Sequence, residues 1–204
     1  SAADDLCLGG GGGVLRGLAR FALERPRMRA GQAWAAARSL EDDEAAWLCS
    51  SYPGAGIYCL DLRLDAREQI RWLAVAAGAA RRLGDRQAEG NHLGNLGVAY
   101  AHLGDARRAV EYCEQALAIA RDICAASPEG SPEWTAGRRG EGADLGNLGL
   151  AYADLGEARR AIDYYARAVA SAREPGDRRG EGARLCNLGL AYADLGEARR
   201  AIEY

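Results

Sequence analysis

Apolar residues along the chain recur with the spacing of amphipathic helices, and these helices come in pairs. One stripe, at positions i, i+3, i+7 and i+10, is formed by Leu145, Leu148, Tyr152 and Leu155. Gly156 follows it and is placed to end the helix, as a capping glycine does. A second stripe is formed by Ala161, Ile162, Tyr165, Ala168, Val169 and Ala172. Residues 175–177 (PGD) close the unit, because proline cannot continue a helix. The pattern predicts a helical hairpin.

The same hairpin is repeated along the chain. The string NLGLAYADLGEARRAI occupies both 147–162 and 187–202, and the similar NLGVAYAHLGDARRAV occupies 95–110. Glu141 and Glu181 lie 40 residues apart, whereas Glu89 and Glu141 lie 52 apart, so one unit contains twelve extra residues. A single hairpin cannot bury both of its stripes, but stacked copies can. The sequence therefore predicts an all-α fold, an α-solenoid of antiparallel helical hairpins.

The order of small and large residues in each unit resembles the tetratricopeptide repeat (TPR). The matching positions are Leu145, Leu148, Gly149, Tyr152, Ala161, Tyr165 and Ala168. The resemblance implies a TPR-like right-handed superhelix in which Gly149 and Ala161 are small because the two helices cross closely there. The 40-residue period exceeds the usual period of about 34, which implies helices longer by about a turn, as in kinesin light chain.

These features divide the chain into three segments. Residues 1–28 are expected to form an N-terminal connector with a Gly-rich linker at Gly9–Gly13. Degenerate helical hairpins are expected over 29–88, with helices at Leu18–Leu40 and Asp42–Tyr52 and a weak copy of the repeat from Ala66. TPR repeats are expected over 89–204, as 89–140 with an insertion at 124–137, 141–180, and a truncated 181–204.

Composition argues against several classes of function. All 26 basic residues are arginine, which excludes a phosphate-loop lysine, a Schiff base and a lysine general base. The net charge of −3 lacks the basic excess of a nucleic-acid-binding protein, and no apolar run is long enough to cross a membrane. The six cysteines contain no CxxC pair and are expected to be buried or half-buried thiols in a reducing, cytoplasmic compartment.

No catalytic, metal or cofactor site is predicted. His92 and His102, the two histidines, lie ten residues apart, which does not fit the i, i+4 spacing of a helical metal site. No nucleophile, base and acid stand at a meaningful spacing. We therefore expect a binding module and not an enzyme.

The TPR resemblance implies a protein or peptide ligand in a concave groove lined by the first helix of each hairpin. It places Asn95, Asn147 and Asn187 there, where an amide can both donate to and accept from an extended backbone. Alternatively, these amides cap turns or bond to the neighbouring hairpin. Further groove positions are Val98, Leu150 and Leu190, which are apolar, and His102, Asp154 and Asp194 near the end of the helix.

Two details of this surface stay open. Asp154 and Asp194 oppose the helix dipole, so they either pair with Arg159 and Arg199 or recognise a basic ligand. Trp134, within the insertion, either is an exposed binding aromatic or folds back over the gap between repeats.

The two ends of the chain add two expectations. The stretch ERPRMRAGQAWAAA resembles the connector before the TPR tail of bacterial STAND-type NTPases, which implies that the repeats are the ligand-sensing arm of such a protein. The alternative is a freestanding TPR adaptor. Because the chain stops at Tyr204, within a second helix, Leu188, Tyr192 and Ile202 are expected to be exposed and to mediate self-association.

Overall fold

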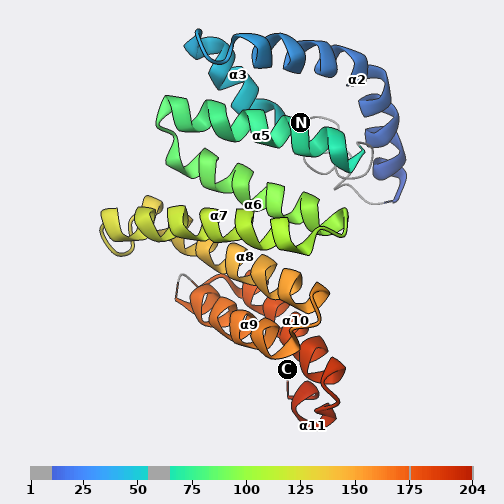
Figure 1. Ribbon diagram of the computed structural model, residues 1–204, viewed down its shortest axis with the longest axis vertical. Coiled ribbons are helices and arrows are strands. Elements are labelled where there is room, and N and C mark those ends of the chain that lie inside the picture. Colours follow the sequence, from blue (N-terminus) through green and yellow to red (C-terminus); the bar gives the residue numbers. More distant parts are fainter. Residues whose placement is uncertain (1–10, 55–64, 175, 204) are drawn as a thin grey trace. The chain divides into compact units, whose positions relative to one another are not determined.

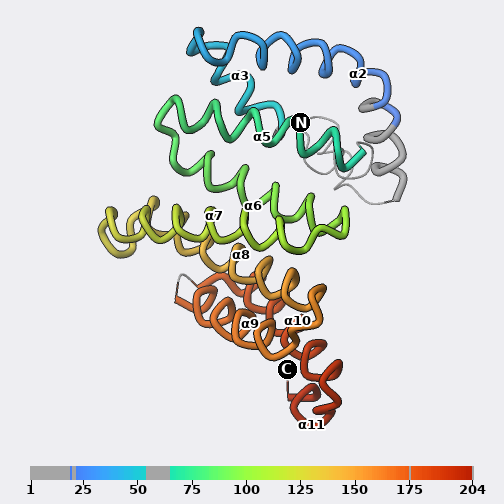
Figure 2. Tube along the Cα trace, in the orientation of Figure 1, coloured from blue at the N-terminus to red at the C-terminus, as the bar shows by residue number. Residues whose placement is uncertain are grey.

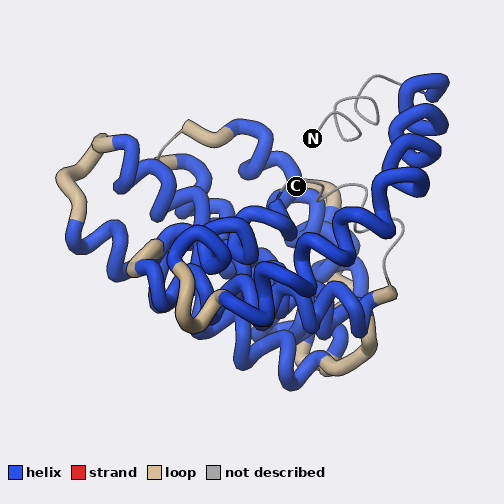
Figure 3. Tube along the Cα trace, turned by 90° about the horizontal axis from the view of Figure 1, so that it is seen from above, coloured by secondary structure: helices blue, strands red, loops and turns tan. Residues whose placement is uncertain are grey.

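The structure is a computed structural model that describes residues 11–54, 65–174 and 176–203, and within these ranges it contains helices and turns but no strand (Figures 1 and 3). The helices are α2 (Gly11–Arg38), α3 (Asp43–Gly54), α5 (Ala66–Leu83), α6 (Arg86–His102), α7 (Ala106–Ala126), α8 (Pro132–Asp154), α9 (Ala158–Arg173), α10 (Arg178–Asp194) and α11 (Ala198–Ala201). The predicted fold class, an α-solenoid of antiparallel helical hairpins, is confirmed. Contacts divide the chain into two compact units, 1–89 and 90–204.

The first unit is built on α2, α3 and α5, with α3 packed against both of the others. Its core is small-residue packing by Ala35, Ala46, Cys49 and Ala79. The two expected helices are present, but α2 begins at Gly11, so Gly11–Gly13 are helical where a linker was expected. Each glycine costs about 1 kcal/mol relative to alanine, which a 28-residue helix tolerates. Gly9 and Gly10 lie outside the described residues.

The second unit stacks successive hairpins: α7 packs on α8, α8 on α9, and α9 on α10 (Figure 2). Both predicted stripes supply its core, which includes Leu145, Leu148, Tyr152, Ala161, Tyr165 and Ala168. Leu155 departs from the prediction and is 37 % exposed, because it is the C-cap of α8 and not part of the helix body. Gly156 follows at φ 76°, a left-handed conformation that favours glycine, whereas Pro175 of the next turn lies outside the described residues.

The insertion at 124–137 mostly lengthens two helices. α7 continues to Ala126, and α8 already begins at Pro132, with the hydroxyl of Ser131 accepting a hydrogen bond from the amide of Trp134. Proline suits the first position of a helix because the amide hydrogen that it lacks has no partner there. The Ser- and Pro-containing stretch is therefore a capped helix start.

The close crossing of the two helices of a hairpin is confirmed at Gly149. A Cβ atom at this position would lie 2.6 Å from ring carbons of Tyr165 on α9. At the equivalent Gly97 of α6, an added Cβ atom would lie 2.3 Å from Sγ of Cys113 on α7. Glycine at this point brings α8 and α9 together and lets the ring of Tyr165 lie directly against the backbone of α8.

Gly149→Ala is expected to lower the free energy of unfolding by about 1–2 kcal/mol, because overpacking outweighs the gain in helix propensity. The matched control is Gly182→Ala on α10, where nothing lies within 4 Å of the added Cβ. This control should raise the free energy of unfolding by about 0.5–1 kcal/mol. Urea denaturation followed by circular dichroism measures both; a stabilised Gly149→Ala variant would contradict the close crossing.

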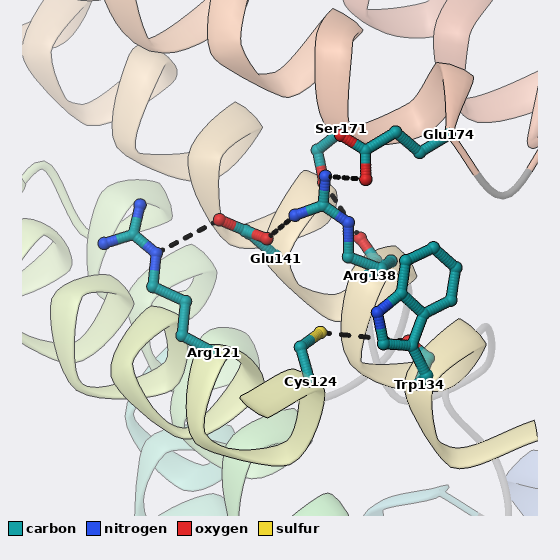
Figure 4. Close-up of polar contacts among 7 residues, drawn as sticks. All are labelled: Arg121, Cys124, Trp134, Arg138, Glu141, Ser171 and Glu174. Carbon is teal, nitrogen blue, oxygen red and sulfur yellow. Dashed lines mark hydrogen bonds and ion pairs between the residues drawn. The ribbon is translucent and has the colours of Figure 1, made fainter. Parts of the chain in front are cut away.

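A buried glutamate held by arginines recurs at the start of the first helices. Glu141 accepts hydrogen bonds from Arg121 of α7, at 3.1 Å, and from Arg138 of α8, and Arg138 also pairs with Glu174 (Figure 4). In the first unit, Glu89 accepts from Arg81 and Arg86 at 2.6 and 2.7 Å. Glu181, at the equivalent position of α10, is half-buried and pairs with Arg173 of α9 at 2.6 Å. The Glu89, Glu141 and Glu181 spacing that defines the repeat thus marks an ion-pair position.

Candidate binding face on the first helices

The predicted ligand residues form one line on each first helix. We call Asn147, Leu150 and Asp154 of α8, together with Asn187, Leu190 and Asp194 of α10, the ligand stripe. The spacing i, i+3, i+7 puts each triplet on a single helix face. Leu150 is 42 % exposed and Leu190 is 60 % exposed, whereas the two asparagines are half-buried beside them. Because α8 and α10 are in contact, the two triplets lie on neighbouring helices.

The asparagine amides of the ligand stripe, and the equivalent amide on α6, are not used by the fold. No hydrogen bond joins Asn95, Asn147 or Asn187 to another group in the described part of the chain. The helix caps next to them are made by other side chains, such as Asp105 for α7 and Asp177 for α10. The expected alternative, an amide that caps a turn or ties two hairpins together, therefore has no hydrogen bond to support it among these residues.

The acidic ends of the stripe are also unpaired. The expected ion pairs of Asp154 with Arg159 and of Asp194 with Arg199 are not formed. Instead, each neighbouring second helix makes its own i, i+3 pair, Arg160 with Glu157 at 2.8 Å and Arg200 with Glu197 at 2.9 Å. The turns through Gly156 and Gly196 put Asp154 and Asp194 on a different helix from the arginines. Both exposed carboxylates therefore remain at helix C-termini, where the dipole disfavours them.

Tyr165 of α9 connects the two acidic positions, which the sequence did not reveal. Its side chain is buried, and its phenol makes no hydrogen bond among the described residues. Burial raises the pKa of Tyr165 to about 12, and the negative charges of Asp154 and Asp194 contribute to this rise. Both carboxylates thus lie within electrostatic reach of one phenol. The apolar stripe correctly assigned the ring to the core, but only the packing of α8 and α10 around α9 places its hydroxyl.

The remaining predicted ligand residues are less concentrated. On α6, Asn95 and Val98 are half-buried and His102 is exposed, so histidine replaces the acid in this copy. Trp134 is half-buried in the first turn of α8: its carbonyl accepts from the Cys124 thiol at 3.8 Å, and the guanidinium of Arg138 lies 5.9 Å from its ring (Figure 4).

The residues expected to be exposed near Tyr204 are only partly so. Leu188 is buried, because it packs into the core with Tyr165, and Tyr192 is half-buried under Arg200. Ile202, at 86 % exposed, behaves as expected. The expected exposure was therefore wrong for Leu188 and only partly met by Tyr192, and self-association stays a prediction.

The four cysteines of the described ranges are free thiols in varied surroundings. Cys49 and Cys113 are buried and Cys124 is half-buried as expected, but Cys186 is exposed on α10. Burial raises the pKa of Cys113 to about 12, which makes this thiol unreactive. Cys7 and Cys59 lie outside the described residues. Within the described ranges, no cluster of three or more His, Cys, Asp or Glu residues suits a metal ion, and no helix is long and apolar enough to span a membrane.

Comparisons with known proteins identify the repeats. Residues 91–129 and residues 145–179 each match a family model described as tetratricopeptide repeat. Both matches fall on the predicted repeats, so the TPR resemblance is confirmed for these two stretches. No curated protein matches the chain.

Solved structures resemble the chain at low sequence identity. BtubC (BKLC) from P. vanneervenii is 15 % identical, with a TM-score of 0.61 over 98 % of this chain and 82 % of that one. A putative kinesin light chain of Podosopora anserina with nearly identical TPR-like repeats is 17 % identical, with a TM-score of 0.51 over 87 % and 90 %. A point variant of that protein is 17 % identical, with a TM-score of 0.52 over 88 % of this chain and 92 % of that one. These likenesses show the fold alone.

Proposed function

We propose that the chain is a protein-interaction module that binds a peptide or protein along the ligand stripe and its continuation on α6. One observation carries the proposal: the asparagines at the equivalent position of three repeats hold amides that the fold leaves without hydrogen bonds. An amide offers a donor and an acceptor, so a ladder of them suits the backbone of an extended ligand. Solenoids use such continuous surfaces for binding.

The test is a pull-down from the native host lysate with the wild-type chain and with the variant Asn95→Ala/Asn147→Ala/Asn187→Ala. We expect the wild type to retain a protein that the variant loses, because the ligand backbone forfeits its amide partners. Gln115→Ala is the control, since this exposed amide lies on α7, a second helix. Circular dichroism confirms that the variants are folded. Equal retention by all three would place the binding surface elsewhere and overturn the proposal.

The finer proposal is that the module is the ligand-sensing arm of a STAND-type signalling NTPase in the cytoplasm. It is supported by the resemblance of ERPRMRAGQAWAAA, at 24–37, to the connector of those proteins. The alternative is a freestanding TPR adaptor. Sequencing the gene upstream of the codon for Ser1 separates them: a nucleotide-binding domain in the same reading frame is expected, and a start codon directly before Ser1 would favour the adaptor.

A further inference from the structure

A groove lies between α2 and α5 in the first unit. The two helices run in the same direction and contact each other (Figure 1). Each helix lines the groove with one face, at the spacing i, i+3, i+4 and i+7: Arg29, Gln32, Ala33 and Ala36 of α2, and Glu68, Arg71, Trp72 and Val75 of α5. The groove has a volume of about 480 Å³, which is in the range of small-molecule sites.

The groove changes from charged to apolar along its length. At one end, Arg29 forms an ion pair with Glu68, whose side chain is 12 % exposed. Two helical turns further along, the walls are the side chains of Ala36 and Val75, and the indole of Trp72 lies between the two ends. A ligand that fits the whole groove therefore has a charged group at one end and an apolar body.

The polar groups that the fold leaves unused in this groove are hydrogen-bond donors. Gln32 is only 2 % exposed; its Oε1 accepts from the Cys49 thiol at 3.6 Å, whereas its Nε2 donates to no group in the described ranges. Arg71 is exposed and forms no ion pair among the same residues. Because Arg29 neutralises Glu68, the guanidinium of Arg71 gives the groove a net positive charge. Both features favour an anionic acceptor.

We infer that this groove binds a small carboxylic acid with a flat apolar body. The carboxylate lies against the Arg71 guanidinium and the Gln32 amide, because a planar carboxylate accepts the parallel N–H donors of a guanidinium. The apolar body contacts Trp72, Ala36 and Val75, where its burial removes apolar surface from water. The site is separate from the ligand stripe, which lies on α8 and α10 of the second unit.

The test uses naphthoate and its neutral analogue naphthamide, two probes of nearly the same shape that differ in charge. Isothermal titration calorimetry on the full chain should show that naphthoate binds about tenfold more tightly, because the neutral amide cannot accept a charge-assisted hydrogen bond. In nitrogen–proton correlation spectra, naphthoate should also shift the indole signal of Trp72, which the variant Trp72→Phe identifies.

Variants assign the preference to the groove. Arg71→Gln should remove the preference for naphthoate, and Gln32→Met, which keeps the length but not the donor, should weaken naphthoate binding a few-fold. Ala33→Phe, at an exposed position of α2, should fill the groove and block both probes. The control Arg27→Gln makes the same charge change as Arg71→Gln at an exposed position outside the groove and should keep the preference. Circular dichroism confirms that the variants are folded.

Three titration results would each overturn the inference: no binding of naphthoate at millimolar concentration, equal affinity for the two probes, or a preference that survives Arg71→Gln. Naphthoate binding without a shift of the Trp72 signal would place the probe elsewhere on the chain and overturn it as well. None of these outcomes bears on the proposed function, which the asparagine variants test separately.

Discussion

Glu141→Ala is expected to lower the free energy of unfolding of the second unit by about 3–5 kcal/mol. The Glu141 carboxylate is 11 % exposed and accepts from both Arg121 and Arg138, while the Arg138 side chain is itself only 17 % exposed. Removing the acid leaves the Arg138 guanidinium with Glu174 as its remaining carboxylate partner, in a site where its Nε already has none (Figure 4). A charge that stays buried without adequate partners is costly to the fold.

Urea denaturation gives the overall effect, and hydrogen exchange of the α8 and α9 amides locates it. Two variants serve as controls. Glu157→Ala removes an exposed i, i+3 partner of Arg160 and should change stability by less than about 0.5 kcal/mol. Glu141→Gln keeps the shape but not the charge and should fall between the two. A Glu141→Ala variant as stable as Glu157→Ala would show that the cluster contributes little.

The repeated part of the fold was predictable because the information is local. The stripe from Leu145 to Tyr152, the glycine that ends it and the duplicate at 187–202 each specify a helix end or a buried face, and stacking follows from repetition. The starts of α2 and α8 were not predictable in the same way. Gly11–Gly13 and the stretch around Pro132 carry loop-type residues, and neighbouring helical sequence together with a Ser131 cap overrides that preference.

The candidate site was predictable in its list of residues but not in its chemistry. The TPR resemblance placed Asn147 and Asp154 on a first helix, and the structure puts both there. Whether Asp154 pairs with an arginine depends on where a turn directs two helices, and the link to Tyr165 depends on three helices packing together. Neither relation has a period along the chain. The burial of Asp144 could not be predicted for the same reason. The equivalent residues of the other repeats are His92 and Arg184, and a polar residue in every copy predicts a position exposed to solvent.

Asp144 is nevertheless a buried acid, 7 % exposed on α8. Its Oδ1 lies 2.7 Å from where a Cβ of Gly94 would be, so it faces α6, and Ala116 of α7 also borders Gly94. The negative charge of Glu141, on the same helix, acts on Asp144, and Asp144 in turn acts on the thiol of Cys113 on α7. No arginine pairs with it among the described residues. Burial, and then the negative charge of Glu141, raise the pKa of Asp144 to about 8.

The raised pKa of Asp144 determines how the stability of the fold depends on pH. An aspartate in the unfolded chain has a pKa of about 3.9, so the folded state holds its proton more tightly between roughly pH 4 and pH 8. The stability contributed by neutral Asp144 is complete below pH 4 and is lost as the pH rises through the folded pKa. Above pH 8 the buried charge costs up to about 6 kcal/mol.

Asp144→Asn should therefore stabilise the protein at alkaline pH and leave it unchanged near pH 4, because asparagine keeps the shape and never ionises. The measurement is the difference in unfolding free energy between the variant and the wild type, from urea denaturation at a series of pH values, so that all other titrating groups cancel. The exposed control Asp163→Asn should show no such trend. A difference that stays constant from pH 4 to pH 9 would mean that Asp144 ionises as readily in the folded chain as in the unfolded one, and its buried position against Gly94 would then have to admit water.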